Sequence, residues 1–566
     1  MTRNSAADTV IRADRVITLG AVELEGPAAV CIRDGLIQAV VPASDVRSWV
    51  GDGTTVVDLG GRTLMPGFVD PHAHAEVAAK ASYQMVDVRA PQCPDIAAVL
   101  RTLRDHLAHA REGWLVGQGN LFFDQKLADQ RFPTREELDS VSTEIAIAIR
   151  AGGHLSILNS RALELSGIDD DYEAVEYSIT GKPAVQRDER GQPTGVVTEM
   201  DKLLPFPGLT AEESRAALES GIRELFTANG VTTIGEISES RDGLKAYDDA
   251  LAEGRMAARI HVYLWTPGTV SLEEACAHST WTDFRSAESL IKIQGVKAFS
   301  DGGYSAARAA LSKPYAIDGH NCGELALTKE QIIRLARRTQ EAGLQLAVHA
   351  NGDRAQLEVC EALAGVSDEY PEGPRIRIEH AGNFVPDYKG LSEAWKAAAI
   401  VPVPQPVFIY NFGEFVPTYV GAYARDLQFP FRRMIDDGWT ISGSSDVWVG
   451  SEVSQTNPFL SIASAVARRT FHGEVLTPDQ GVSIYEALRM HTVGGAYALG
   501  EEHTRGRLEP GMLADLIVLD RDPLAVPPEE LLDIKVEEVF LGGKHVYSTT
   551  STPGIGNFSA LAAAES

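Results

Sequence analysis

Cysteine and long hydrophobic runs are the scarcest features of this sequence. The five cysteines are scattered and odd in number, and no Cys-x-x-Cys pair occurs. This usage argues against a disulfide scaffold and predicts a reduced, cytoplasmic protein. No window approaches about 18 uninterrupted apolar residues, so no membrane-spanning helix is expected. The polar residues 1–9 also lack the charged-then-apolar pattern of a secretory signal.

Positive charge is the next deficit. The chain has 51 Lys and Arg residues against 79 Asp and Glu residues, which gives a formal charge of −28. Nucleic acids and anionic membranes are themselves polyanions, so this balance argues against both as partners. A small molecule remains as the expected partner, and the sequence leaves a homodimer open.

The chain alternates β-like and helical patterns between residues 65 and 500, which is typical of βα units around a parallel sheet. We count eight predicted strands, and they indicate an α/β fold with a TIM-like (β/α)8 barrel. The strands are the segment ending at His74 and residues 231–236, 260–264, 293–299, 346–349, 376–380, 400–404 and 439–446.

One interval breaks this rhythm. About 150 residues separate the first and second predicted strands, where a barrel needs about 30 to 40. We therefore predict a large insertion over about 75–220, with its own strands and helices. Insertions on this side of a barrel usually wall or cover the site.

Short strand patterns at both termini predict a second module. Residues 1–64 contain too few strands for a core of their own, and matching strands occur over 501–550. We expect both ends to form one small β-sandwich, with the barrel of residues 65–500 inserted between them and a loose tail over 551–566.

Metal-binding residue types recur at the predicted strand ends. His72 and His74 are two apart in an extended segment, so their side chains point the same way. In a barrel of this class the reactive side chains project from the carboxyl ends of the strands. Reading off those ends gives His72, His74, Lys297, His349, His380 and Asp446. Singly, each could serve the fold as a capping, core or paired residue; their shared position indicates a metal site.

Lys297 is the unusual member of this set. A protonated ammonium group cannot ligate a metal. A neutral lysine can react with carbon dioxide, and the resulting carbamate could bridge two cations. Otherwise Lys297 must serve as a charge partner, and a single metal ion would be expected.

These stretches together resemble the amidohydrolase superfamily, and within it the amidohydrolase-3 (YtcJ-like) group that includes N-substituted formamide deformylases. The resemblance covers nearly the whole chain. Two departures, Asn351 and the Val447-Trp448 pair after Ser445-Asp446, suggest an altered substrate pocket. The matching stretches are residues 64–74, 296–302, 348–354, 377–381, 444–446 and 506–516.

The resemblance implies a set of roles. It makes Asp446 the catalytic acid and base, and Lys297 a candidate N6-carboxylysine bridging one or two Zn²⁺ ions. Gly153-His154 before Asn159-Ser160 matches a group segment, so His154 is expected to contact substrate, and Glu199 is expected to do the same. The zinc ligands that the resemblance implies are His72, His74, His349 and His380.

A mechanism follows from these expected roles. Zinc lowers the pKa of water to about 7, and Asp446 would accept the water proton and return it to the departing amine. His154 or His380 would help to stabilise the negative oxygen of the tetrahedral intermediate. Aromatic residues could line an apolar pocket, although each could equally be a core residue. They are Phe122, Phe123, Tyr304, Phe408 and Trp448.

The favoured interpretation is a zinc-dependent hydrolase of a non-peptide amide or formamide-type C–N bond. The alternatives are a hydrolytic deaminase, a lactonase, or a scaffold that has lost its metals. Lys297, and the absence of a glutamate beside the His349 motif, favour amide hydrolysis over deamination. The intact histidines and Asp446 argue against the scaffold.

Overall fold

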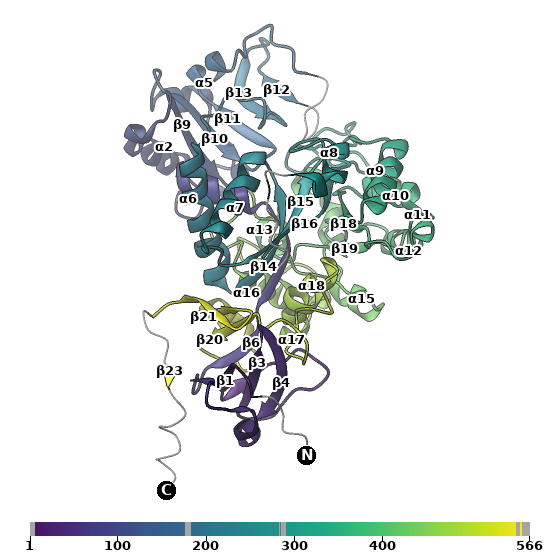
Figure 1. The fold of residues 1–566 in the computed structure, drawn as a ribbon. Coiled ribbons are helices and arrows are strands. Elements are labelled where there is room, and N and C mark those ends of the chain that lie inside the picture. The colour runs from purple at the N-terminus through teal and green to yellow at the C-terminus, as the bar shows by residue number, and fades with distance from the viewer. Residues whose placement is uncertain (1–5, 176–182, 282–283, 285–289, 551–554, 557–566) are drawn as a thin grey trace.

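We describe the protein from a computed structural model that covers residues 6–175, 183–281, 284, 290–550 and 555–556. The centre of the molecule is a sheet of seven strands, in which each neighbouring pair is parallel (Figure 1). This sheet confirms the predicted α/β, TIM-like barrel, which is nearly closed. Its strands are β7 (Phe68–Ala73), β14 (Val231–Ser238), β15 (Arg259–Trp265), β16 (Ile291–Phe299), β17 (Gln345–His349), β18 (Arg377–Glu379) and β19 (Val401–Val403).

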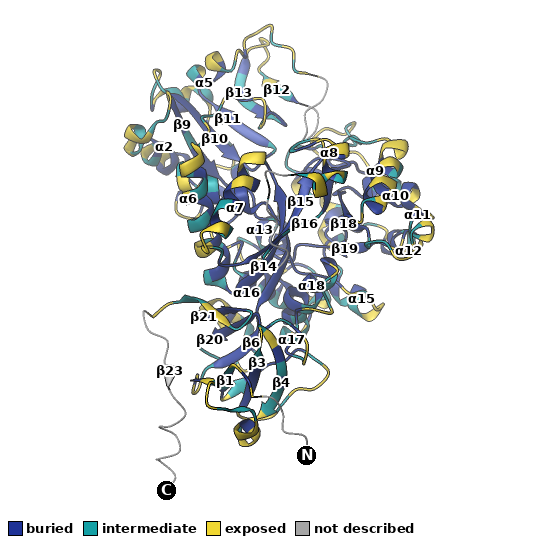
Figure 2. Cartoon of the chain, viewed as in Figure 1, coloured by how far each residue is buried: buried dark blue, intermediate teal, exposed yellow. Residues whose placement is uncertain are grey.

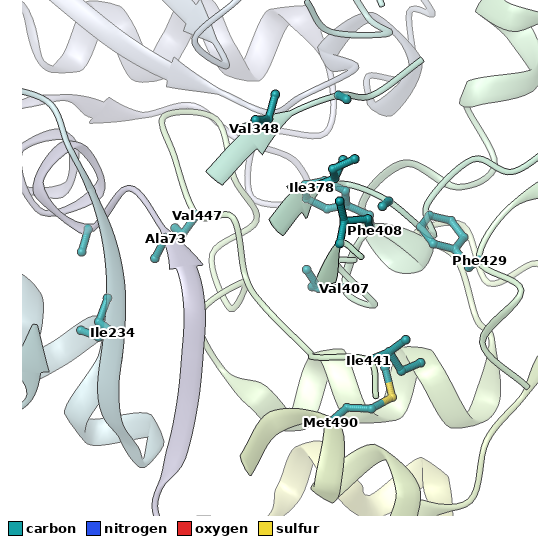
Figure 3. Packing of buried hydrophobic residues seen from close by; sticks show 14 of the residues in the cluster. Ala73, Ile234, Val348, Ile378, Val407, Phe408, Phe429, Ile441, Val447 and Met490 are labelled. Atoms are coloured by element: carbon teal, nitrogen blue, oxygen red, sulfur yellow. The ribbon is translucent and has the colours of Figure 1, made fainter. Parts of the chain in front are cut away.

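Helices cover the outside of this sheet, and its strands are buried on both faces apart from the first half of β16. In Figure 2 the strands are dark blue, and the exposed surface lies on the helices and loops. Figure 3 shows Ile234, Val348 and Ile378 in one buried hydrophobic cluster with residues that follow the barrel strands, such as Phe408 in α13 (Phe408–Phe412). The covering helices include α7 (Arg241–Ala252), α9 (Lys329–Glu341), α10 (Asp353–Leu363), α12 (Tyr388–Ala397) and α16 (Pro458–Ala467).

The eighth predicted strand, over residues 439–446, is wrong. This segment is not a strand, and two backbone hydrogen bonds attach its end to β7: Asp446 N donates to His72 O at 2.8 Å, and His74 N donates to Val447 O at 3.0 Å. Glycine and aspartate fit a pleated strand poorly, and Asp446 has a positive φ of 44°, so a regular ladder does not continue through it. A side chain replaces one ladder contact, since Ser445 N donates to Asp70 Oδ1 at 3.1 Å.

The long interval after β7 contains a separate six-stranded sheet, seen at one end of the molecule in Figure 1. It lies between α1 (Ala75–Gln84) and α6 (Ala211–Gly221) and has its own hydrophobic clusters. Its strands are β8 (Val86–Asp87), β9 (Trp114–Gly119), β10 (Ala146–Ala151), β11 (Leu155–Leu158), β12 (Ala184–Arg187) and β13 (Pro193–Thr198).

The terminal segments form two five-stranded sheets at the opposite end (Figure 1). One contains β1 (Thr9–Ala13), β3 (Ala28–Arg33), β4 (Leu36–Pro42), β5 (Thr55–Asp58) and β23 (Ile555–Gly556). The other combines strands from both ends of the chain: β2 (Arg15–Val16), β6 (Thr63–Pro66), β20 (Leu516–Leu519), β21 (Val536–Leu541) and β22 (Lys544–Ser548). Ile11, Val30, Leu516 and Phe540 share one buried cluster.

The domain boundaries at 64, 500 and 550 stay predictions, and the tail expected over 551–566 lies outside the described residues apart from β23. Among the helices that the structure describes, none combines the length and the apolar character needed to cross a bilayer.

A buried ion pair joins the barrel to the terminal sheets. Arg259, at the start of β15, donates from Nε and Nη2 to the two oxygens of Asp515 at 2.7 and 2.8 Å. Gly542 N donates to the same carboxylate at 2.8 Å. Both side chains are less than a tenth exposed, so the pair is shielded from water and its geometry is bidentate.

We expect Asp515→Ala to lower the free energy of unfolding by about 3–5 kcal/mol, because the buried Arg259 guanidinium loses its bidentate carboxylate. Chemical denaturation measures this change. The exposed Glu529→Ala is the control and should shift the same quantity by no more than about 0.5 kcal/mol. Equal stability of the two variants would contradict the assigned role of the pair.

Candidate metal centre

One cavity of about 70 Å³ lies at the carboxyl ends of the barrel strands, and the residues predicted from those ends meet in it. His72 and His74 come from the end of β7, Lys297 from β16 and His349 from β17. His380 follows β18 directly, and Asp446 comes from the irregular segment that replaces the eighth strand. The structure therefore brings all six residues together.

Two neighbouring side chains fix the orientation of His72. Its Nδ1 contacts the Glu379 carboxylate, and Arg377 Nε donates to Glu379 Oε1 at 2.5 Å. The opposite nitrogen, Nε2, lies 3.3 Å from Asp446 Oδ1 and 3.1 Å from Lys297 Nζ. Burial, and then the Lys297 charge, lower the His72 pKa well below its usual value. His72 is therefore a neutral imidazole with Nε2 turned into the cavity.

His74 repeats this arrangement. Its Nδ1 lies 3.3 Å from Glu239 Oε1, and Lys202 Nζ donates to Glu239 Oε2 at 2.5 Å. Its Nε2 lies 3.6 Å from Asp446 Oδ1, and its ring stacks on Trp448 with 3.9 Å between centroids. Burial lowers the His74 pKa to about 4. Metal-binding histidines commonly have a carboxylate on the second nitrogen, because it fixes the tautomer and the ring.

His380 and His349 form the other side of the cavity. His380 Nε2 lies 3.0 Å from His349 Nδ1, and His380 Nδ1 lies 2.7 Å from Gln405 Oε1. The far nitrogen of His349, Nε2, lies 3.4 Å from Asp301 Oδ1. Burial lowers the pKa of His380 to about 3 and that of His349 well below its usual value. Both rings are therefore neutral and able to act as ligands.

Asp446 and Lys297 are an acid and an amine buried in the same cavity. Burial raises the pKa of the Asp446 carboxyl, while the Lys297 charge opposes that rise. Burial lowers the pKa of the Lys297 ammonium, and the Glu379 and Asp446 carboxylates oppose that fall. Burial makes the charged form of each group costly when it is alone. The protonation of Asp446 and that of Lys297 therefore depend on one another.

His154 reaches the cavity from the inserted sheet, just before β11. Its Nδ1 lies 3.1 and 2.9 Å from the two oxygens of Glu199. Burial alone would lower the His154 pKa, but the Glu199 carboxylate outweighs it and the pKa lies above the usual value. Glu199 is fully buried and is not among the cavity-lining residues. It therefore orients His154, and its own contact with substrate stays a prediction.

The aromatic residues divide between the cavity and the core. Tyr304 and Trp448 line the cavity, and the Tyr304 hydroxyl donates to Asn351 O at 2.5 Å. Phe123 does not line it but lies in the hydrophobic cluster of the inserted sheet. Phe122 has a left-handed backbone, with φ of 54°, which turns its own ring into the cavity and its neighbour away. Phe122, Phe299, Phe408 and Phe412 are the phenylalanines of the lining.

Sequence reasoning missed the partners that hold the histidines: Glu239, Glu379, Asp301 and Gln405. Two of them stand in motifs that carried the resemblance, since Glu379 directly precedes His380 and Asp301 follows Ser300. Glu239 and Gln405 stand in no recognised motif, and only the register of the barrel reveals their contacts.

The donor set fits a metal ion. Ligand atoms of His72, His380 and Asp446 lie within 4.8 Å of one another. Neutral imidazole nitrogens and a carboxylate oxygen suit zinc and similar divalent ions. Carboxylates that hold the outer nitrogens of His72 and His74 complete the arrangement that such ligands usually have.

Imidazoles and a carboxylate at the carboxyl end of a parallel barrel define a class of metal-dependent hydrolases. The chain belongs to the Amidohydrolase family, whose model matches residues 55–547. It is 29% identical over 536 residues to the N-substituted formamide deformylase of Arthrobacter pascens, which covers 93% of this chain and 95% of that protein.

Two solved structures support the same assignment. They are uncharacterised metal-dependent hydrolases from Pyrococcus furiosus and Pyrococcus horikoshii OT3, each 25% identical to this chain, with TM-scores of 0.65 and 0.69. The first comparison covers 91% of this chain and 100% of the other chain, and the second covers 92% and 99%. The chain is therefore an enzyme, a metal-dependent amidohydrolase that acts on carbon–nitrogen bonds.

We expect Glu239→Gln to weaken metal binding about 10- to 100-fold, because the amide no longer holds the His74 tautomer as a carboxylate does. Competition with a chromogenic chelator for Zn²⁺ measures the affinity. Glu253→Gln, at the surface end of α7, is the control and should bind as the wild type does. An unchanged affinity in Glu239→Gln would show that this carboxylate does not support the site.

Proposed function

We propose that this enzyme uses zinc to hydrolyse a non-peptide amide bond of the formamide type in a small molecule. The observation that carries the proposal is the position of Asp446. Its Oδ1 lies 3.3 Å from His72 Nε2 and 3.6 Å from His74 Nε2, and its Oδ2 lies 3.9 Å from His380 Nδ1. The 29% identity to an N-substituted formamide deformylase supports the choice of bond.

The expected ligands are His72, His74, His349 and His380, and a zinc ion bound by them would lower the pKa of water and polarise a carbonyl oxygen. Asp446 would accept the proton of the attacking water at its carboxylate and donate it to the nitrogen of the departing amine. A buried carboxyl whose pKa is raised toward neutrality suits both steps.

His154 would assist the same step from the opposite wall. Glu199 holds its Nδ1, which leaves Nε2 for a hydrogen bond to the oxygen that becomes negative as the acyl carbon is attacked. His380 is the alternative to His154 for this contact, in place of its role as a metal ligand. The aromatic lining, including Tyr304 and Trp448, would exclude bulk water and strengthen these electrostatic contacts.

Lys297 would determine whether one or two ions bind. It is fully buried, and burial lowers the pKa of its ammonium group, so the neutral amine needed for reaction with carbon dioxide is accessible. As N6-carboxylysine it would offer two oxygens to a pair of ions. Left unmodified, it would serve as a charge partner beside one ion. The homodimer and the cytoplasmic location stay predictions.

We expect Asp446→Asn to retain zinc through the imidazoles and to lose activity about 10²- to 10⁴-fold, because the amide cannot accept the water proton. Metal analysis and steady-state kinetics on the same preparation measure both quantities. Full activity in this variant would refute the role of Asp446.

A substrate panel tests the proposed reaction. The wild type should release amine from N-substituted formamides, acyl-amides or N-acyl amino acids, lose this activity with a chelator and regain it with added Zn²⁺. Lactones and amino-substituted rings complete the panel. Turnover confined to those compounds would replace amide hydrolysis with lactone hydrolysis or deamination, and stoichiometric zinc would argue against a scaffold.

A further inference from the structure

Asp446 stands in a backbone conformation that is unfavourable for a residue other than glycine. Its φ of 44° lies in the left-handed region, which costs of the order of 1–3 kcal/mol for a residue other than glycine. The segment before it is not a strand and therefore lacks a regular ladder. One backbone bond, from Asp446 N to His72 O, ties it to the barrel. Further contacts must hold the carbonyl side of the same residue.

Gln455 supplies these contacts. Its Nε2 donates to Ser445 O at 2.9 Å and to Asp446 O at 3.3 Å. Its Oε1 accepts from Glu452 N at 3.0 Å and from Asn411 Nδ2 at 2.8 Å. The side chain is almost fully buried, and both donors and both acceptor positions of its amide are used. Such a group has one orientation, so it can fix the backbone that it touches.

A buried ion pair extends this contact to the inserted segment. Lys126, at the end of α3 (Phe123–Lys126), donates to Glu452 Oε1 at 2.6 Å and to Asn411 Oδ1 at 2.7 Å. Asn120 Nδ2 donates to both oxygens of Glu452 at 3.1 and 3.2 Å. We call Asn120, Lys126, Asn411, Glu452 and Gln455 the Gln455 network; all five are buried.

The members of the Gln455 network flank residues that line the cavity. Leu121 and Phe122 lie between Asn120 and Lys126, and both line it. Asn411 belongs to α13 (Phe408–Phe412), whose first and last residues line it as well. The rings of Phe122 and Phe412 meet with 5.4 Å between centroids. One set of hydrogen bonds therefore holds two cavity walls and the backbone of Asp446.

We propose that Gln455 is a positioning residue for Asp446, and that the Lys126–Glu452 pair makes this placement depend on the inserted segment. The proposal rests on the proposed function, in which Asp446 transfers the proton. Gln455 contacts Asp446 at the backbone carbonyl, so it acts on the carboxylate only through the backbone. Its effect on turnover passes through the position of one carboxylate.

Gln455→Met tests the first part, because methionine has a similar shape and removes all four hydrogen bonds. We expect kcat to fall roughly 10- to 100-fold, since a displacement of about 1 Å can cost that much, with KM and zinc content nearly unchanged. Gln428→Met is the matched control: Gln428 is also buried and donates to a backbone carbonyl, that of Gly413, at 2.9 Å. Its kcat should stay within about 2-fold.

Double variants separate positioning from general damage. In the Asp446→Asn background, Gln455→Met should lower activity by less than about 2-fold more, because the carboxylate it positions is already absent. A full further loss of activity in the double variant, or a wild-type kcat in Gln455→Met alone, would overturn the proposal.

The same logic tests the link to the inserted segment. Lys126→Met/Glu452→Gln removes both charges together and so avoids leaving a lone buried carboxylate. We expect this variant to lower kcat and to show no further loss when Gln455→Met is added. If the losses of kcat from Lys126→Met/Glu452→Gln and from Gln455→Met multiply in the combined variant, the dependence on the inserted segment is overturned.

A structural measurement separates this proposal from the proposed function. Crystal structures of the wild type and Gln455→Met should show the Asp446 carboxylate withdrawn from His72 and His74 in the variant. An unmoved carboxylate would overturn the proposal whatever the enzyme hydrolyses. If no amide is turned over while the carboxylate moves, the proposed function fails and the positioning role stands.

Discussion

The arrangement of the site depends on the burial of one carboxylate, that of Asp446, among neutral imidazoles. Burial lowers the pKa of His72, His74 and His380 and raises that of Asp446. Buried polar atoms without hydrogen-bond partners are energetically costly. Glu379 therefore provides a partner for His72, and Glu239 provides one for His74. Their contacts leave the opposite nitrogens facing one space, which is the geometry that a divalent cation requires.

The irregular closure of the barrel follows from the same constraint. Side chains along a strand alternate between two faces, so a regular eighth strand would fix the direction of Asp446 by its register alone. The positive φ at Asp446 breaks that alternation. Side chains of Asp70 and Gln455 then provide the contacts that a ladder would otherwise make. The position of the acid is thus set by side-chain contacts as well as by the sheet.

Seven strands and the gathering of six site residues could be predicted, because apolar periodicity and strand ends are visible in the sequence. The eighth strand could not be predicted correctly. Residues 439–446 resemble a strand in sequence, but Ser445 N donates to the Asp70 side chain and not to the backbone of a neighbouring strand. Phe122 lines the cavity as expected and Phe123 does not, and the sequence could not separate the two because the left-handed backbone of Phe122 cannot be read from composition. Glu239 was missed because it lies just beyond β14, whereas the predicted strand ended at residue 236, so its contact with His74 could not be read from the strand end.

The second terminal sheet has a consequence for how the chain is made. Its strand β6, which leads directly into the first barrel strand, pairs with β20, so that Met65 faces Ile517. A ribosome releases β6 long before β20 exists, and this edge of the nascent chain must wait without its partner. Pairing across such a separation is slow. The completion of this sheet therefore belongs to a late stage of folding, after residues 516–519 have been synthesised.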